Sequence, residues 1–414
     1  MQNTIADAAV PKVTAAPVRR MAPRLLAAAL ALMSAGTAAP CPAHAGVSTT
    51  GTAAMFRCDP AHDGVCDTRG IGHVGGPYRR PLWRFRTGQL NRSTPAVAGG
   101  MVYVGSDSGY LYALNAADGQ LKWRFTTQGE LNSSPTCDHG RVYFTGGDGD
   151  VYALDARDGH RLWMFRTGPL DGKRPEWDFF QSSPVVADGV VYVGSGDGKV
   201  YALDAQTGAQ RWAFRTDGVV RSSPAVAGGT VYVGSMGGTL YALDARDGRK
   251  RWSFKTQGNK DFPLGEIQST PAVADGTVYF GSRDSTLYAL DAKTGAQRWA
   301  DRDPQGAWVI SGPAVAHGTV YFATSDSHRI EAVDAASGKT RWNVDAGGRV
   351  FASPVLVGTR LYLGLADGEA VWMDKATGKL LGEAPSEGTI YGSVAVSDGV
   401  IYYASDDGYV YAAK

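Results

Sequence analysis

The sequence lacks an excess of charge of either sign. Its 414 residues include 41 Lys and Arg and 40 Asp and Glu. A protein that binds nucleic acid needs a basic surface against the phosphates, so we expect no nucleic-acid partner. Beyond residue 45 the chain also lacks any apolar run long enough to cross a bilayer. We therefore expect no transmembrane span in the mature protein.

The one long apolar run lies near the N-terminus. Three arginines precede a Leu- and Ala-rich stretch over residues 25–39, and a small-x-small cleavage site lies at residues 43–45. This pattern predicts a secretory signal peptide over residues 1–45. We expect an exported protein, periplasmic or extracellular, and associated with the outer membrane if Cys41 carries a lipid. Translation could start at Met1 or at Met21.

Cysteine is scarce, with four in the whole chain. Cys58 and Cys66 flank a short segment within an N-terminal extension over residues 46–80. In an oxidising compartment this spacing predicts a local disulfide. The alternative is a metal site that uses His62, for which the sequence offers no convincing fourth ligand. Cys137 lies in a predicted strand and is expected to be a small core residue.

A helical period of 3.6 residues is absent beyond the leader. Instead, a Ser-x-Pro or Ser-Pro motif leads, eight residues after its Pro, to a Tyr. An eighth copy has Val394 in place of the Pro and Tyr402 at the same offset. Self-similarity at a period of roughly 40 residues is typical of propellers and solenoids. The seven lead prolines are Pro95, Pro135, Pro184, Pro224, Pro271, Pro313 and Pro354.

Each copy contains four short apolar runs separated by Gly, Asp or Asn, as in residues 222–256. This is the pattern of strands joined by hairpin turns. Four antiparallel strands per unit indicate a propeller blade, so residues 81–414 are predicted to form an all-β, eight-bladed β-propeller. The chain ends after the third strand of the eighth copy. The segment around Trp83 matches the missing fourth strand and is expected to close the last blade, which removes an open edge.

A second spacing, of eight residues from the Asp or Asn that ends the third strand to the Trp of the fourth strand, carries a family resemblance. The segment over residues 202–212, ALDAQTGAQRW, is similar to the tryptophan-docking repeat of the pyrroloquinoline-quinone-type eight-bladed propellers. That family includes the quinoprotein alcohol dehydrogenases and BamB, an outer-membrane-assembly lipoprotein, and the chain is closest in style to BamB. The resemblance implies that each Trp is buried between two blades next to a turn glycine. The expected docking residues are Trp83, Trp123, Trp163, Trp212, Trp252, Trp299 and Trp342.

Blade seven departs from this repeat at two positions. Gly382 stands where the docking Trp is expected, and Trp372 stands where the third strand has Ala. Because core volume tends to be conserved, we predict that Trp372 fills the space that the docking Trp leaves.

Three long connections between successive blades are expected on one face of the disc, around the mouth of a central funnel. They span residues 169–181, 259–268 and 301–310 and mix aromatic with charged side chains, a composition that suits recognition. The alternative is that the aromatic residues only anchor their own loops. The candidate partner-binding residues are Lys173, Arg174, Trp177, Phe179, Phe180, Phe262 and Trp308.

A second candidate surface lies deeper, at the start of each innermost strand. Blades one to five place polar residues there, and blades six to eight place apolar or aromatic ones. Such a ring could orient an amphipathic ligand or a peptide, or could simply line a water-filled channel. The ring comprises Arg92, Asn132, Gln181, Arg221, Gln268, Ile310, Phe351 and Tyr391.

The sequence favours a non-catalytic scaffold that binds an envelope protein or peptide, as a monomer or within a larger complex. None of the seven His residues forms a motif with a Ser or Cys nucleophile, so no catalytic residue is assigned. The first alternative is a dehydrogenase that depends on pyrroloquinoline quinone and Ca²⁺. The family's adjacent Cys-Cys pair and long ligand-bearing insertions are absent, so no cofactor or metal is expected. The second alternative is a glycan- or wall-binding module that uses Trp177 and Trp308.

Overall fold

The computed structural model describes residues 53–66, 81–169 and 181–414, all within one compact unit, Ala38–Lys414. The predicted signal peptide, with Cys41, lies outside the described residues. So do five of the candidate loop residues, which are Lys173, Arg174, Trp177, Phe179 and Phe180. The described part of the chain forms 32 strands. It contains no helix that could cross a membrane.

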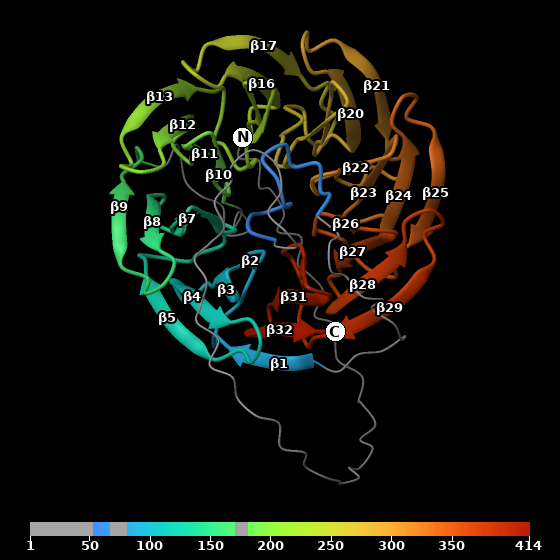
Figure 1. Ribbon diagram of the computed structural model, residues 1–414. Helices are drawn as coiled ribbons and strands as arrows, with labels where there is room; N and C mark the ends of the chain where they lie inside the picture. Colours follow the sequence, from blue (N-terminus) through green and yellow to red (C-terminus); the bar gives the residue numbers. More distant parts are fainter. Residues whose placement is uncertain (1–52, 67–80, 170–180) are drawn as a thin grey trace, which may run out of the picture. The chain divides into compact units, whose positions relative to one another are not determined.

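The strands form eight four-stranded antiparallel sheets arranged as a ring (Figure 1). Blade 1 contains β2 (Ala96–Ala98), β3 (Met101–Gly105), β4 (Tyr110–Asn115) and β5 (Leu121–Thr126). Blade 2 contains β6 (Thr136–Asp138), β7 (Arg141–Thr145), β8 (Val151–Asp155) and β9 (Arg161–Phe165). Blade 3 contains β10 (Val185–Ala187), β11 (Val190–Gly194), β12 (Lys199–Asp204) and β13 (Gln210–Arg215). Blade 4 contains β14 (Ala225–Ala227), β15 (Thr230–Gly234), β16 (Thr239–Asp244) and β17 (Lys250–Lys255).

The second half of the ring repeats this order. Blade 5 contains β18 (Ala272–Ala274), β19 (Thr277–Gly281), β20 (Thr286–Asp291) and β21 (Gln297–Arg302). Blade 6 contains β22 (Ala314–Ala316), β23 (Thr319–Ala323), β24 (Arg329–Asp334) and β25 (Thr340–Asp345). Blade 7 contains β26 (Val355–Val357), β27 (Arg360–Gly364), β28 (Glu369–Asp374) and β29 (Leu380–Pro385). Blade 8 contains β30 (Ala395–Ser397), β31 (Val400–Ser405), β32 (Tyr409–Ala413) and β1 (Pro81–Arg86).

The ring closes where the two ends of the propeller sequence pair. β1 runs antiparallel to β32, with Trp83 opposite Ala412 and Phe85 opposite Val410. The predicted all-β, eight-bladed propeller and its closure by the strand near Trp83 are therefore confirmed. Pairing the N-terminal strand with the last blade leaves no open blade in the ring.

The docking tryptophans join neighbouring blades through one recurring contact. In blade 2, Trp163 Nε1 and Tyr143 Oη both donate to the carbonyl oxygen of Ala205 in blade 3, each at 3.0 Å. The indole also covers Gly208, whose φ is +74° and where a Cβ atom would lie 2.7 Å from the ring. Glycine is thus required both by the turn and by the close approach. The indole N–H donates to the next blade's backbone at Trp83, Trp123, Trp163, Trp212, Trp252, Trp299 and Trp342.

Blade seven compensates for its missing docking residue. Trp372 pairs across the sheet with Gly382 and is only 1% exposed. It packs in one core cluster with Val394, Val396 and Ile401 of blade 8. The indole therefore fills the contact between blades 7 and 8 from the third strand rather than the fourth, as predicted.

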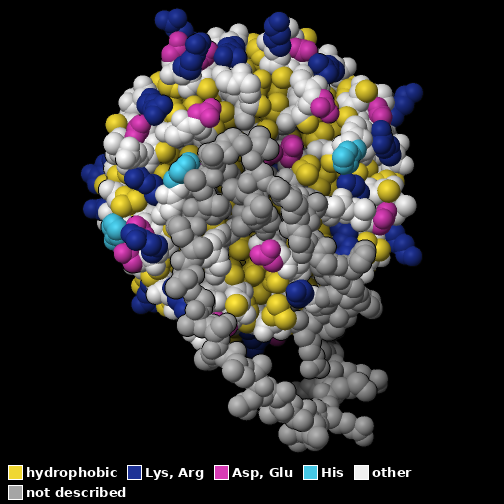
Figure 2. Space-filling model, in the orientation of Figure 1, with side chains coloured by type: hydrophobic (Ala, Val, Ile, Leu, Met, Phe, Trp, Pro, Cys, Tyr) yellow, Lys and Arg dark blue, Asp and Glu magenta, His cyan; other side chains and the backbone are white. Residues whose placement is uncertain are grey.

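Basic and acidic side chains both lie around the rim of the disc (Figure 2). In blades 3 to 6 an Arg on the outer strand pairs with the Asp that ends the third strand, at N–O distances of 2.7 to 2.8 Å. Exposed pairs of this kind stabilise little individually. Because each pair places opposite charges side by side, the rim of these blades is not a purely basic or a purely acidic surface.

Candidate functional site

Eight residues, one from each blade, surround a cavity at the centre of the ring. Its volume is about 90 Å³. Each of the eight precedes the innermost strand of its blade, so the cavity lies at the face that carries the connections between blades. The structure brings together the whole set that the sequence placed at the funnel: Arg92, Asn132, Gln181, Arg221, Gln268, Ile310, Phe351 and Tyr391.

A layer of hydroxyl side chains, here called the hydroxyl ring, lies next to these residues and links the blades. Thr94 N donates to Ser134 Oγ at 3.0 Å, and Ser134 N donates to Ser183 Oγ at 2.9 Å. The same contact closes the ring between blades 8 and 1, where Ser393 N donates to Thr94 Oγ1 at 2.8 Å. The Ser-x-Pro motif thus has a physical role, because its hydroxyl satisfies a buried N–H of the neighbouring blade. The hydroxyl ring comprises Thr94, Ser134, Ser183, Ser223, Thr270, Ser353 and Ser393.

Residues 53–66, here called the clasp, cross the centre of the ring as the blue segment of Figure 1. Their carbonyl groups accept hydrogen bonds from inward-facing N–H groups of the innermost strands of six blades. The Cys58–Cys66 disulfide joins the two halves of the clasp. The acceptor–donor pairs are Ala53–Val97 (2.8 Å), Ala54–Cys137 (2.7 Å), Pro60–Val226 (2.6 Å), Ala61–Val273 (3.0 Å), Asp63–Val315 (2.7 Å) and Gly64–Leu356 (2.8 Å).

The clasp closes the channel beneath the cavity. Phe56 contributes to the cavity lining, and His62 packs edge-on against it with ring centroids 5.7 Å apart. Burial lowers the pKa of His62 to about 3, so the imidazole is neutral. The water-filled channel considered from the sequence is therefore blocked on one side.

Arg57 explains the one gap in the hydroxyl ring. Blade 6 has Gly312 where the other blades have Ser or Thr. The Arg57 guanidinium occupies that space and donates to the carbonyl oxygen of Pro313. Burial lowers the pKa of Arg57 to about 10, against the opposing charges of Asp63 and Asp59.

The polar half of the cavity is held by internal contacts. Arg92 forms ion pairs with Asp406 (3.3 Å) and Asp107 (3.7 Å) and lies 5.3 Å from the ring centroid of Tyr391. Burial raises the pKa of Asp107 to about 6, although Arg92 opposes the shift. Gln181 Oε1 accepts hydrogen bonds from the backbone N–H groups of residues 132 and 133. The Arg92 charge is therefore balanced by two carboxylates within the site.

The apolar half is formed by an aromatic pair. Phe351 and Tyr391 are stacked, with ring centroids 5.0 Å apart and an interplanar angle of 26°. Both are partly exposed at the mouth, whereas Ile310 is buried. The amphipathic division that the sequence indicated is present in the cavity wall.

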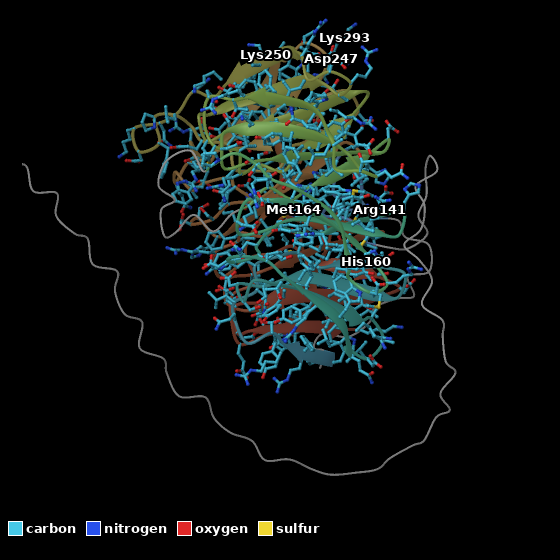
Figure 3. All side chains as sticks on the ribbon, turned by 90° about the vertical axis from the view of Figure 1, so that its left-hand side faces the viewer. Arg141, His160, Met164, Asp247, Lys250 and Lys293 are labelled. Carbon is cyan, nitrogen blue, oxygen red and sulfur yellow. A yellow bond between two sulfur atoms is a disulfide. The ribbon has the colours of Figure 1, made fainter. Side chains whose placement is uncertain are left out.

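The rim of the funnel holds the two described loop aromatics together. Phe262 and Trp308 meet edge-to-face, with ring centroids 5.0 Å apart. The guanidinium of Arg283 lies 4.9 Å from the centroid of Trp308, and Arg283 Nη2 donates to Gln268 Oε1 at 2.6 Å. His160, in the β8–β9 turn, lies on the opposite face of the disc (Figure 3).

Three charged residues of this face were not predicted from the sequence. The same position of the repeat, in the turn that follows the second strand of the blade, is occupied by Asp107, Arg283 and Asp406. Other blades have Gly, Met, Ala or Ser there. A charged residue at a position that is uncharged in the other blades was the available signal. Phe56 was not predicted either, because the clasp lies outside the repeat.

The size of the central cavity bears on the quinone cofactor that the family resemblance raises. An apolar cavity of about 150 Å³ takes up one benzene ring, and the present cavity, at about 90 Å³, is smaller. Among the residues that the structure describes, one cluster could hold a metal ion, formed by Asp155, Asp158 and His160. It lies in the β8–β9 turn, away from the cavity, and carries no proposal.

A family comparison identifies the chain. The family model described as outer membrane protein assembly factor BamB matches residues 77–176, 169–300 and 255–414, which together cover the whole propeller. The chain belongs to the BamB family. No curated protein matches it by sequence.

Solved structures show how widely this fold is used. BamB from Moraxella catarrhalis is 21% identical with a TM-score of 0.68, covering 81% of this chain and 99% of that one. A europium-containing methanol dehydrogenase is 17% identical with a TM-score of 0.70, covering 86% and 89%. The computationally designed Ika8 protein is 18% identical with a TM-score of 0.64, covering 80% and 99%. At such identities the likeness of this BamB-family chain to an assembly factor, an enzyme and a designed protein shows the fold alone.

Proposed function

We propose that this BamB-family chain is a non-catalytic, exported scaffold that binds a protein or peptide of the cell envelope through the funnel face of the propeller. The observation that carries the proposal is the construction of that face. Aromatic and charged side chains meet at its rim, while the clasp fills the centre that a larger ligand would need. Aromatic and Arg side chains are the ones that most often dominate protein interfaces.

Family membership supports an assembly role. The matched family is described by outer membrane protein assembly, and the predicted signal peptide fits a role in the envelope. In this proposal Phe262, Trp308 and Arg283 contact the partner, together with the candidate loop residues 173–180. Since Phe262 and Trp308 also pack on each other, they anchor their loops and form the contact surface at once.

Site-specific photo-cross-linking in cells tests this proposal. A photoreactive phenylalanine analogue replaces Phe262 or Trp308 in the full chain, and Lys293, an exposed residue of a turn on the opposite face, is the matched control. We expect an envelope protein to be captured from the first two positions and not from Lys293. Equal capture from all three positions, or none, would contradict the proposal. Deletion of the gene should also lower the amount of outer-membrane β-barrel proteins.

The second candidate is a dehydrogenase dependent on pyrroloquinoline quinone and Ca²⁺, which the likeness to the methanol dehydrogenase raises. Purified protein mixed with the quinone and Ca²⁺ should show neither bound-cofactor absorbance nor dye-linked alcohol oxidation. Stoichiometric binding with turnover would replace the scaffold proposal with this one. The glycan-binding alternative is weakened by Trp308, because the ring meets Phe262 and Arg283 rather than standing free for a sugar.

A further inference from the structure

The outer edge of the disc differs between the two halves of the ring. In blades 3 to 6 an Arg of the outer strand pairs with the Asp that ends the third strand. The same two positions hold Leu82 and Lys414 in blade 8, and Lys122 and Asn115 in blade 1. Blades 8 and 1 therefore lack the carboxylate that balances the outer strand in blades 3 to 6.

The outer strands of blades 8 and 1 also carry additional cations. Arg84 and Arg124 occupy a position that holds Ala, Ser or Asn in blades 3 to 6. β1 and β5 together contain four basic and no acidic residues, and the acidic residues of these two blades lie in turns and connections. Five exposed cations form no ion pair with any residue that the structure describes: Arg84, Arg86, Lys122, Arg124 and Lys414.

Exposed leucines accompany these cations. Leu82 is 56% exposed and Leu121 is 43% exposed. Leu162 of blade 2 and Leu381 of blade 7 are exposed on the neighbouring outer strands. Among the described residues, the outer strands of blades 3 to 6 carry no exposed large apolar side chain. A single exposed Leu is ordinary, but this row covers the four blades that lack the Arg–Asp pair between the outer and third strands.

Two tyrosines hold the guanidinium groups at this surface. The guanidinium of Arg84 lies 4.8 Å from the ring centroid of Tyr409, and that of Arg124 lies 4.6 Å from the ring centroid of Tyr110. Stacking on a ring leaves the N–H groups of an Arg free to bind an anion. Leu, Tyr and Arg together are typical of surfaces that meet a membrane, because aromatic rings lie at the level of the headgroups and long cationic side chains reach the phosphates.

The shape of this surface favours a bilayer over an acidic peptide. β1 and β5 are neighbours on the convex outer edge of the ring (Figure 1). Leu82 and Leu121 belong to different blades, so a peptide would need a groove between them to bury both side chains. A broad anionic surface can instead contact both strands at once.

We propose that the outer edge of blades 8 and 1, here called the basic rim, binds the surface of an anionic lipid bilayer. The five cations contact the lipid phosphates, and Leu82 and Leu121 enter the boundary between the headgroups and the acyl chains. Because the basic rim lies on the edge of the disc, this docking leaves the funnel face free for a protein partner. The inference goes beyond the proposed function and does not depend on it.

Vesicle co-sedimentation of the purified full chain tests the proposal. The chain carries Cys41→Ser so that no lipid is attached, and any remaining leader is the same in every variant. Vesicles of phosphatidylcholine with about one-third phosphatidylglycerol are compared with vesicles of phosphatidylcholine alone. We expect tighter binding to the anionic vesicles. This difference should disappear as the salt is raised from about 0.1 M to about 1 M, because the Debye length falls from about 10 Å to about 3 Å.

Two double variants test the residues of the basic rim. Arg84→Gln with Arg124→Gln should weaken binding to the anionic vesicles about 25-fold, since each cation near such a surface contributes about fivefold in affinity. Leu82→Ser with Leu121→Ser should weaken it about tenfold or more, because both side chains lose their burial in the bilayer.

Matched controls remove the same kinds of side chain elsewhere. Arg211→Gln with Arg251→Gln takes two cations from the rim of blades 3 and 4, and Leu264→Ser takes an exposed leucine from outside the basic rim. Both should leave vesicle binding unchanged, and circular dichroism verifies that each variant is folded.

Three results would overturn the proposal. They are equal binding to the two kinds of vesicle, equal loss in the basic-rim and control variants, and no loss on replacement of the two leucines. Binding of an octaglutamate peptide without binding to the anionic vesicles would also overturn it, and would indicate an acidic protein partner. None of these results affects photo-cross-linking at Phe262 and Trp308, so the scaffold proposal stands or fails separately.

Discussion

Substitution of the turn glycine under each docking tryptophan allows the contribution of the contact between blades to the free energy of unfolding to be measured. Gly208 and Gly189 lie in blade 3 and have nearly the same backbone conformation, with φ of +74° and +71°. A Cβ on Gly208 would lie 2.7 Å from the Trp163 ring, and one on Gly189 would meet nothing within 4 Å. The two Gly→Ala substitutions therefore share a backbone cost and differ in the packing against the indole.

The expected magnitudes follow from these distances. Alanine in the left-handed region costs roughly 1–2 kcal/mol, which is the whole effect expected for Gly189→Ala. Overpacking adds about 1–3 kcal/mol, so Gly208→Ala should lower the free energy of unfolding by about 2–5 kcal/mol in total. Urea-induced unfolding followed by far-UV circular dichroism gives both values, provided that the two variants have the same m-value.

A third variant identifies the source of the difference. With Trp163 replaced by Ala, the space above Gly208 is open, and Gly208→Ala and Gly189→Ala should destabilise the protein equally. The reasoning is refuted if the two substitutions already cost the same in the wild-type protein. It is also refuted if the extra cost at Gly208 persists without the indole.

Three further predictions concern the clasp and one buried acid. Replacing Cys58 and Cys66 by Ser should lower the stability of the folded clasp by about 2–3 kcal/mol, the loop-closure value for so short a loop, and hydrogen exchange of the inward-facing amides should accelerate while the outer strands keep their protection. Gly312→Ser should destabilise the wild-type protein by about 1–3 kcal/mol because Arg57 occupies the space, and a thermal-unfolding double-mutant cycle should show a smaller cost in an Arg57→Ala background. Burial raises the pKa of Glu331 from 4.5 to about 7, so its contribution to stability is full below pH 4.5 and is lost as the pH rises through about 7. A Glu331→Gln variant should therefore gain stability relative to wild type as the pH is raised through this window, by about 1–3 kcal/mol, and a constant difference across the window would contradict the assignment.

The fold could be predicted from the sequence because the propeller is built from local, repeated contacts. The residue before the motif Pro places its hydroxyl against a buried N–H of the preceding repeat. The Asp-to-Trp spacing places the indole over the turn glycine of the next blade. The departures from the repeat could also be interpreted from local packing. Trp372 could be assigned to the core because Gly382 left a volume that had to be filled.

The site could be predicted only in part, for a physical reason. The eight residues around the cavity share a position in the repeat, so the repeat itself predicted that they lie together. The clasp has no repeat, and its bonds to the blades use backbone carbonyl groups that leave no trace in side-chain identity. One residue of the blades does indicate the contact with the clasp. Gly312 breaks the hydroxyl ring in the blade that receives Arg57, which is evident only once both ends of the contact are known.

The clasp favours the proposed scaffold over the cofactor-binding alternative. On this proposal a cofactor at the centre would displace the clasp and break, among others, the six hydrogen bonds that its carbonyl groups accept from the innermost strands. Even if water replaced every acceptor, the net loss of about 0.5–1.5 kcal/mol for each bond would amount to roughly 3–9 kcal/mol. The disulfide between Cys58 and Cys66 reduces the conformational entropy that the clasp would gain on release. With its centre occupied by its own chain, the propeller retains a shallow cavity and an aromatic rim, and these suit a peptide segment rather than a large cofactor.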